Sequence, residues 1–309
     1  MIGIESIAVY LPEGRVDNTK RLEQFNLTKE FLQTKTGMSR LSRKGEGEET
    51  SDMCCTAIQT LMDERELAAE EIECLIVCTQ NPDGYGLPHT SAIVHGKLGL
   101  SRDCAVFDIS LGCSGYVYGL SVIKGFMLSN EFTRGVLVTA DPYSKVVDEQ
   151  DKNTSLLFGD AATATLVSDK PKWDIGKFCF GTDGSHCFAI NVNNETRLLE
   201  MNGRAVFNFT ATVVPRNISR TLEENGLEKA DIDCFVLHQG SRYIRDTLAK
   251  RMGLEPEKVP FQAGDYGNTV SSSVPIILAN EGDVSKHILI SGFGVGLSWG
   301  STILTKVDN

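Results

Sequence analysis

The sequence predicts an α/β protein made of two similar halves. Strand-like segments rich in β-branched and aliphatic residues alternate with helical segments along the 309 residues. In addition, residues 61–78 (LMDERELAAEEIECLIVC) align without a gap on residues 221–238 (TLEENGLEKADIDCFVLH). The alternation indicates buried sheets covered by helices, and the repeat indicates two copies of one α/β unit.

The elements that give this class can be placed along the chain. Strands are predicted at residues 4–11, 74–80, 104–110, 135–141, 163–169, 234–240, 287–293 and 301–307. Helices are predicted around residues 53–65, 115–129, 206–225 and 244–252. No Pro- or Ser-rich linker separates them.

The internal repeat continues beyond its first pair of segments. Residues 136–141 parallel 288–293, and residues 158–167 loosely parallel 293–304. Chance similarity between helix–loop–strand segments is the alternative, but three pairs in the same order favour duplication. The spacing is too long for a solenoid repeat. We therefore expect an N-terminal half at 1–168 and a C-terminal half at 169–309.

Composition excludes several classes of protein. The formal net charge is −11, with 41 acidic against 30 basic residues, which argues against nucleic-acid binding. No apolar run reaches the length of a membrane span, and the first residues read as a strand, so we expect no signal peptide. Nine cysteines without a disulfide-like spacing favour reduced thiols in the cytoplasm. Cys74 and Cys78 lie in an apolar strand, and we expect no metal site.

Cys113 is the first candidate for chemistry. It lies between Gly112 and Gly115, after a predicted strand and before an apolar helix. A thiol at a helix N-terminus is exposed to the positive end of the helix dipole, which stabilises a thiolate. A buried structural cysteine is the alternative, and this segment alone does not decide between the two.

His238 and Asn268 strengthen the case for a nucleophile. His238 ends a predicted strand, and Asn268 lies in a Gly-Asn-Thr turn that leads into small residues. Taken singly, such a histidine is usually structural and such a turn is usually only a turn. Together, a Cys from the first half and a His and an Asn from the second half each follow a strand. This arrangement allows them to converge on one thiol.

The chain resembles the β-ketoacyl-acyl-carrier-protein (ACP) synthase III family of thiolase-fold condensing enzymes. The similarity covers nearly the whole length and is carried by TKTGMSR, GCSGYVYGL, FGDAATATL, LHQGSRYI, YGNTVSSSVP and GFGVGLSWGS, in that order. The resemblance implies a five-layer αβαβα thiolase fold formed by two similar halves, and a homodimer.

The resemblance also implies a reaction in two steps. The family's nucleophile falls on Cys113, its active-site histidine on His238 and its asparagine on Asn268. Cys113 would take an acyl group from acyl-CoA, and malonyl-ACP would then lose carbon dioxide and condense with that acyl group. His238 and Asn268 would stabilise the enolate, and the backbone amides of Cys113 and Val295 would form a second oxyanion hole. No permanently bound cofactor is expected.

Several positions depart from the family's usual residues. Val295 stands in a loop that commonly has three glycines, so its side chain is expected to crowd or reshape the pocket. The tryptophan that stacks on the CoA adenine is replaced by Phe31, and two accompanying arginines are replaced by Lys35 and Lys152. The other residues expected at the CoA site are Ser241 and Arg242.

Two further groups of residues follow from the resemblance. Leu87, Met201 and Phe293 are expected to line the acyl tunnel, with Leu87 reaching across the dimer interface to close the partner's tunnel. The basic residues Arg245, Lys250 and Arg251 on the helix after His238 are expected to dock the acidic ACP. A solvated helical face is the alternative for this basic cluster.

Other functions stay open at this point. One is Cys113-dependent acyl transfer to a hydroxyl or amine without decarboxylation, and another is a non-catalytic subunit that binds the carrier. Retention of Cys113, His238 and Asn268 argues against the latter. Thiolase and hydroxymethylglutaryl-CoA synthase activities are disfavoured because their second acid–base residues have no evident match. The sequence does not identify the acyl donor.

Overall fold

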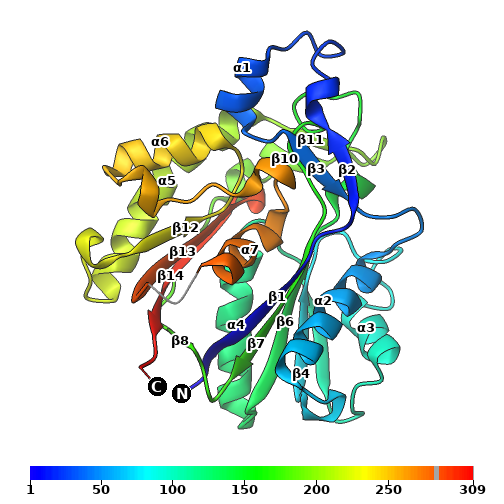
Figure 1. Cartoon of the computed structure of the whole chain (residues 1–309), viewed down its shortest axis with the longest axis vertical. Helices are drawn as coiled ribbons and strands as arrows, with labels where there is room; N and C mark the ends of the chain where they lie inside the picture. Colours follow the sequence, from blue (N-terminus) through cyan, green and yellow to red (C-terminus); the bar gives the residue numbers. More distant parts are fainter. Residues whose placement is uncertain (282–284, 309) are drawn as a thin grey trace.

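The protein has one large sheet with a distinct part in each half of the chain (Figure 1). The computed structural model describes residues 1–281 and 285–308. In the first part the order is β1-β7-β6-β4-β5, with β1 (Gly3–Tyr10), β4 (Cys74–Cys78), β5 (Ala105–Ile109), β6 (Arg134–Ala140) and β7 (Ala162–Ser168). In the second part the strand order is β12-β13-β14, and β9 also pairs with β14. These strands are β9 (Cys179–Thr182), β12 (Cys234–Leu237), β13 (His287–Gly294) and β14 (Ser298–Lys306). The short β8 (Trp173–Ile175) pairs with β1 and β14 and joins the two parts.

Helices form three layers around the two parts of the sheet. Between them lie α4 (Gly115–Asn130) and α7 (Ser273–Asn280). One outer layer is α2 (Thr50–Arg65) and α3 (Thr90–Leu98), and the other is α5 (Gly203–Glu224) and α6 (Arg242–Met252). The expected five-layer αβαβα fold is confirmed.

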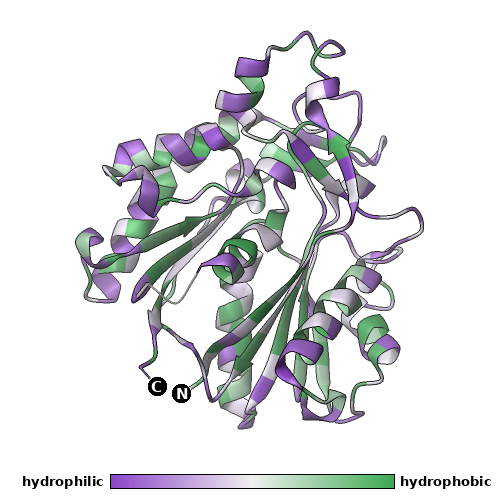
Figure 2. Ribbon diagram, in the orientation of Figure 1, coloured by the Kyte–Doolittle hydropathy of each residue, from purple (hydrophilic) through white to green (hydrophobic). Residues whose placement is uncertain are grey.

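The strands β4, β6 and β12 carry few polar residues because both of their faces are buried. In β6, Leu137 packs into the middle core with α4, whereas Val136 and Val138 pack into the outer core with α2. In β12, Val236 belongs to the middle core and Phe235 to the outer core with α5 and α6. Figure 2 shows the same pattern, with hydrophobic strands inside and mixed helices outside. This is why these strands read as continuous apolar runs.

The internal repeat corresponds to equivalent elements. β4 pairs in parallel with β6, and β6 pairs antiparallel with β7. In the same way β12 pairs in parallel with β13, and β13 pairs antiparallel with β14. The repeated segments run from a helix through a short 3₁₀ turn into a strand in both halves, through η3 (Ala69–Glu71) and η6 (Lys229–Asp231). Two similar halves are therefore present, and the boundary at residue 168 stays a prediction.

All eight predicted strands and four predicted helices form, but shorter elements were missed. These are α1 (Lys29–Phe31), α3, α7, β2 (Gly14–Asp17), β3 (Arg40–Arg43), β8, β9, β10 (Ile190–Val192) and β11 (Leu199–Met201). The first helical residues of α7, Ser273 to Leu278, are all buried, so α7 has no polar face to give a helical period. No helix in the described part of the chain is long and apolar enough to cross a membrane.

Candidate active site

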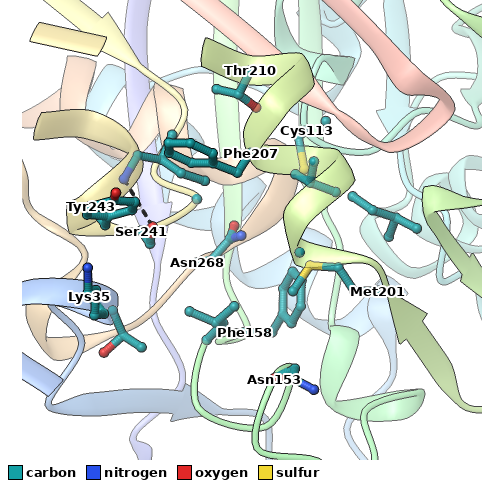
Figure 3. A pocket seen from close by; sticks show the side chains of 18 of the residues that line it. Lys35, Cys113, Asn153, Phe158, Met201, Phe207, Thr210, Ser241, Tyr243 and Asn268 are labelled. Carbon is teal, nitrogen blue, oxygen red and sulfur yellow. Dashed lines mark hydrogen bonds between the residues drawn. The ribbon is translucent and has the colours of Figure 1, made fainter. Parts of the chain in front are cut away.

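A cavity of about 490 Å³ lies where the two halves meet. At its inner end the lining side chains are buried: Cys113, Tyr143, Phe158, Ile190, His238, Asn268 and Phe293. At its entrance the lining residues are exposed: Phe31, Lys35, Lys152, Asn153, Gly203 and Tyr243. The cavity thus leads from exposed side chains to the buried thiol. Figure 3 shows Lys35 and Tyr243 on one side of the lining side chains and Cys113 on the other.

Cys113 sits at the elbow between β5 and α4. The elbow needs glycine at 115, because a Cβ there would lie 2.3 Å from the sulfur of Cys78 on β4. Glycine is also needed at 294, where a Cβ would lie 2.8 Å from the Cys113 sulfur. The elbow places Cys113 just before Ser114, the N-cap of α4, with only 6% of its surface exposed.

Opposing effects act on the Cys113 thiol. Burial raises its pKa to about 12, and the charge of the buried Asp141 carboxylate acts in the same direction. Hydrogen bonds from the backbone amides of Val295 and of Cys113 itself lower the pKa. The thiol is therefore protonated at neutral pH. The two amides expected to form an oxyanion hole both act on this sulfur.

His238 is held in one orientation at the end of β12. Its backbone N–H donates to the carbonyl of Ser291 on β13 at 2.9 Å, and Nδ1 shares a 2.7 Å hydrogen bond with the Ser273 hydroxyl. Phe293 meets the imidazole edge-on, with ring centroids 5.6 Å apart. Burial lowers the pKa of His238 to about 3, while a hydrogen bond to the Val270 backbone acts in the opposite direction. The ring is therefore neutral, and Nδ1 is the nitrogen that the Ser273 hydroxyl engages.

Asn268 is fixed at both its backbone and its side chain. Its N–H donates to the carbonyl of Leu157 at 2.8 Å, and its own carbonyl accepts from the N–H of Gly159 at 3.0 Å. The side-chain Oδ1 accepts from the N–H of Val270 at 2.9 Å. With the carbonyl oxygen of the amide engaged in this way, its NH₂ group is the available donor.

The backbone at Val270 is strained. Its φ is 54°, a left-handed conformation that a β-branched residue adopts at a cost of about 1–3 kcal/mol. The side chain is fully buried, so the surrounding core enforces this conformation. The strained turn directs the Val270 N–H back to the Asn268 side chain.

The entrance is built from aromatic rings and cations. Lys35, on the π-helical turn η2 (Leu32–Thr36), lies with Nζ 4.0 Å from the ring centre of Tyr243. Tyr243 in turn stacks on Phe207 of α5 at 5.3 Å. Phe31, Lys152 and Ser241, all expected at the CoA site, line the same cavity. Two lysines at the entrance give it a positive charge on an acidic protein.

Some expected site residues lie elsewhere. Arg242 is not among the cavity's lining residues: it packs over Phe261 at 4.4 Å and borders a separate polar hollow of about 750 Å³. Leu87 is 93% exposed and does not line the cavity of its own subunit, whereas Met201 and Phe293 do.

The basic residues expected to dock the carrier differ in accessibility. The side chain of Arg245 is only 11% exposed and is paired with Asp246, with a contact of 3.0 Å. Lys250 and Arg251, at the end of α6, are exposed. Of the three side chains, only those of Lys250 and Arg251 are exposed.

Sequence reasoning missed several residues around the cavity. Ser273, the partner of His238, lies in a serine run whose polarity resembled an ordinary loop. Tyr143 follows the end of β6 and so lies at the same edge of the sheet as Cys113, a signal that could have identified it. Phe207 belongs to a helix with other apolar residues, and nothing in the sequence separates it from the core.

Behind the thiol lies a buried carboxylate. Asp141 accepts hydrogen bonds from the N–H of Gln80 at 2.7 Å and from the hydroxyl of Ser271 at 2.5 Å. Burial raises the pKa of Asp141 to about 6, although these hydrogen bonds oppose the shift. Because Ser271 belongs to η9 (Val270–Ser272) in the second half, Asp141 connects the two halves beneath the cavity.

Comparisons with known proteins agree with this geometry. Residues 107–184 match the family model of 3-oxoacyl-[acyl-carrier-protein (ACP)] synthase III, and residues 222–306 match that of its C-terminal part. A β-ketoacyl-[acyl-carrier-protein] synthase III from Streptococcus pneumoniae is 32% identical over 98% of both chains.

Solved structures give the same result. A 3-oxoacyl-(acyl-carrier protein) synthase from Burkholderia xenovorans superposes with a TM-score of 0.92 at 31% identity, covering 99% of this chain and 94% of that one. The 3-oxoacyl-[acyl-carrier-protein] synthase III of Aquifex aeolicus gives 0.91 at 29% identity, with 99% and 100% covered. The chain therefore belongs to the 3-oxoacyl-[acyl-carrier-protein] synthase III family of condensing enzymes.

Proposed function

We propose that this protein catalyses decarboxylative condensation of an acyl group with malonyl-ACP to give a β-ketoacyl-ACP. Cys113 carries the acyl group, and His238 and Asn268 stabilise the enolate of the second substrate. The observation that carries the proposal is the set of hydrogen bonds that fixes these two side chains. Ser273 engages Nδ1 of His238, and Val270 engages Oδ1 of Asn268, so we assign Nε2 of His238 and the NH₂ group of Asn268 to the shared cavity.

In the first half-reaction the Cys113 sulfur attacks the thioester carbonyl of acyl-CoA. The carbon–sulfur bond to CoA breaks, and the proton of the thiol passes to the departing CoA thiolate. The backbone amides of Val295 and Cys113 already act on the sulfur, and the same donors stabilise negative charge on the thioester oxygen. The N-terminal turn of α4 adds the positive end of its dipole.

In the second half-reaction malonyl-ACP loses carbon dioxide, and the electron pair passes into an enolate. The enolate carbon attacks the acyl thioester on Cys113 and expels the cysteine thiolate, which then takes up a proton. We assign the Ser273 hydroxyl as donor to Nδ1 of His238, which places the imidazole proton on Nε2. A neutral imidazole and an amide NH₂ then both donate to the enolate oxygen in a buried site.

The entrance supports binding of CoA and of the carrier's prosthetic arm. Lys35 and Lys152 provide positive charge for phosphate groups, and the rings of Phe31 and Tyr243 provide stacking surfaces. For the acidic carrier protein we propose docking on Lys250 and Arg251, which are exposed at the end of α6.

We also propose a homodimer in the cytoplasm. β5 is the last strand of its sheet and pairs with β4 on one side only among the described residues, so its other edge is open to a second copy. Tyr85 and Leu87 are more than nine-tenths exposed, and apolar surface of this kind favours a partner. All nine cysteines are free thiols, as a reducing compartment allows. Sedimentation velocity tests the dimer; a monomer at micromolar concentration would contradict it.

Intact-protein mass spectrometry tests the activity. Incubation with acyl-CoA should add one acyl mass to the protein, and Cys113→Ala should prevent the addition. Malonyl-ACP should then discharge the acyl group as β-ketoacyl-ACP with release of carbon dioxide. Failure of every donor to acylate Cys113 would favour a carrier-binding subunit. An acyl-enzyme that does not react with malonyl-ACP would favour transfer of the acyl group to a hydroxyl or amine.

A further inference from the structure

Aromatic side chains line the buried end of the cavity near Cys113. Tyr143, on η4 (Tyr143–Lys145), is 4% exposed and lines the cavity beside Cys113. Its ring packs on Phe158, with centroids 4.9 Å apart. Cys113, Tyr143 and Phe158 belong to one apolar cluster. An acyl group on Cys113 must therefore fit against the Tyr143 ring.

The Tyr143 ring is fixed by a hydrogen bond as well as by packing. Its hydroxyl donates to Oε1 of Gln80 at 3.2 Å. Gln80 is fixed in turn, since its backbone N–H donates to the buried Asp141 carboxylate at 2.7 Å. The ring thus has contacts at its face and at its tip, and a longer acyl chain cannot displace it without breaking one of them.

The space next to the nucleophile is also filled. A Cβ on Gly112 would lie 2.6 Å from Oε1 of Gln80, 2.6 Å from Cγ1 of Val295 and 3.4 Å from the hydroxyl of Tyr143. Three side chains therefore converge on the residue that precedes Cys113. The side chain of Val295 therefore crowds the space beside Cys113, as its position in the loop suggested. The side chain of Tyr143 crowds the same space.

We propose that Tyr143 is the specificity-determining residue that limits the length of the acyl group on Cys113. The inference rests on the proposed function, because it concerns the acyl-enzyme. It assigns the limit to a residue of the same subunit rather than to Leu87, which is 93% exposed and is expected to reach the tunnel of a partner subunit. The donors accepted are then short acyl-CoAs, and their length is limited by the bulk of the ring.

Acylation rates with acetyl-, butyryl-, hexanoyl- and octanoyl-CoA test this inference. In Tyr143→Leu the rate with hexanoyl- or octanoyl-CoA relative to acetyl-CoA should rise by at least about tenfold, since room for additional methylenes in an apolar pocket is worth that much. Tyr143→Phe keeps the ring and should retain the wild-type profile, as should Leu87→Ala. Continued acylation of Tyr143→Leu by acetyl-CoA shows that this variant is folded.

Three results would overturn the proposal. One is a wild-type profile in Tyr143→Leu that still accepts acetyl-CoA. The second is a broadened profile in Leu87→Ala, which would return the limit to the dimer interface. The third is equal broadening in Tyr143→Phe and Tyr143→Leu, which would exclude the bulk of the ring as the cause. If no donor acylates the wild-type protein, the proposed function itself fails, and that result is distinct from all three.

Discussion

The two ends of the cavity are built in different ways. At the buried end, the side chains of His238 and Asn268 are held by hydrogen bonds: His238 by Ser273, and Asn268 by Val270. At the entrance, side chains are exposed and are held by ring and cation contacts such as that of Lys35 with Tyr243. The buried end is therefore suited to stabilise one developing charge, and the entrance to bind a long, flexible substrate. Substitutions at the two ends should separate chemistry from binding.

The largest effect is expected at the buried donors. His238→Ala or Asn268→Ala should lower the rate of decarboxylative condensation by about 10²–10³-fold, because each removes one fixed donor to the enolate oxygen. Acylation of Cys113 by acyl-CoA should be affected much less, since the amides of Val295 and Cys113 serve that step. Single-turnover measurements of each half-reaction check this. Equal losses in both half-reactions would contradict the division of roles.

The next effect concerns stability beneath the buried end. The pKa of Asp141 is raised to about 6 in the folded protein from 3.8, so the folded state binds more protons than the unfolded state between these values. Burial of this carboxylate therefore destabilises the protein above pH 6, and the penalty disappears as the pH falls below 3.8. Asp141→Asn should become more stable relative to wild type by about 2–3 kcal/mol as the pH rises from 4 to 7.5.

Urea unfolding of both proteins at the two pH values measures this difference. Comparison with wild type cancels the other titrating groups, including His238. A relative stability that does not change with pH would mean that Asp141 has an ordinary carboxyl pKa in the folded protein.

A smaller effect is expected from the residue that orients His238. Ser273→Ala should slow condensation by up to about tenfold, because the imidazole loses the partner that keeps the proton on Nε2. Ser272→Ala is the matched control, since its hydroxyl contacts the carbonyl of Thr139 instead. Steady-state condensation rates, with acylation measured separately, compare the two. An equal loss in both variants would indicate a general effect on α7.

The smallest effect is expected at the entrance. Lys35→Ala should raise the KM for acyl-CoA by about three- to fivefold with little change in kcat, as expected for an exposed cation near phosphate groups. Lys29→Ala removes a lysine of α1 that does not line this cavity and should leave KM unchanged. A fall in kcat for Lys35→Ala would break the distinction between the two ends.

The sequence predicts the chemical end of the cavity better than the end of its acyl pocket. Cys113 follows β5 and His238 follows β12, and the ends of such strands meet at one edge of a sheet. Asn268 was expected to follow a strand as well, but it comes after the 3₁₀ turn η8 (Ala263–Asp265). The structure brings all three to one cavity, although their roles stay a proposal. The burial of Arg245 depends on how helices pack, which no local pattern records. The expected contact of Leu87 with a partner's tunnel stays a prediction.

The secondary structure was likewise predicted in part: long strands were found and short ones were missed. Long apolar segments such as 135–141 were predicted as strands because both faces are buried. The strands β10 and β11 were missed because each is three residues long and pairs only with the other. Ser273 was missed because its role appears only once α7 places it beside His238.

The left-handed backbone of Val270 implies a conflict between durability and catalysis. Glycine adopts that conformation readily, so Val270→Gly relieves the torsional strain, at the expense of the buried valine side chain. The same change loosens the turn whose N–H holds the carboxamide of Asn268. Val270 thus fixes the side chain of Asn268 at the cost of strain in its own backbone. Selection for thermal stability alone would therefore act against valine at this position.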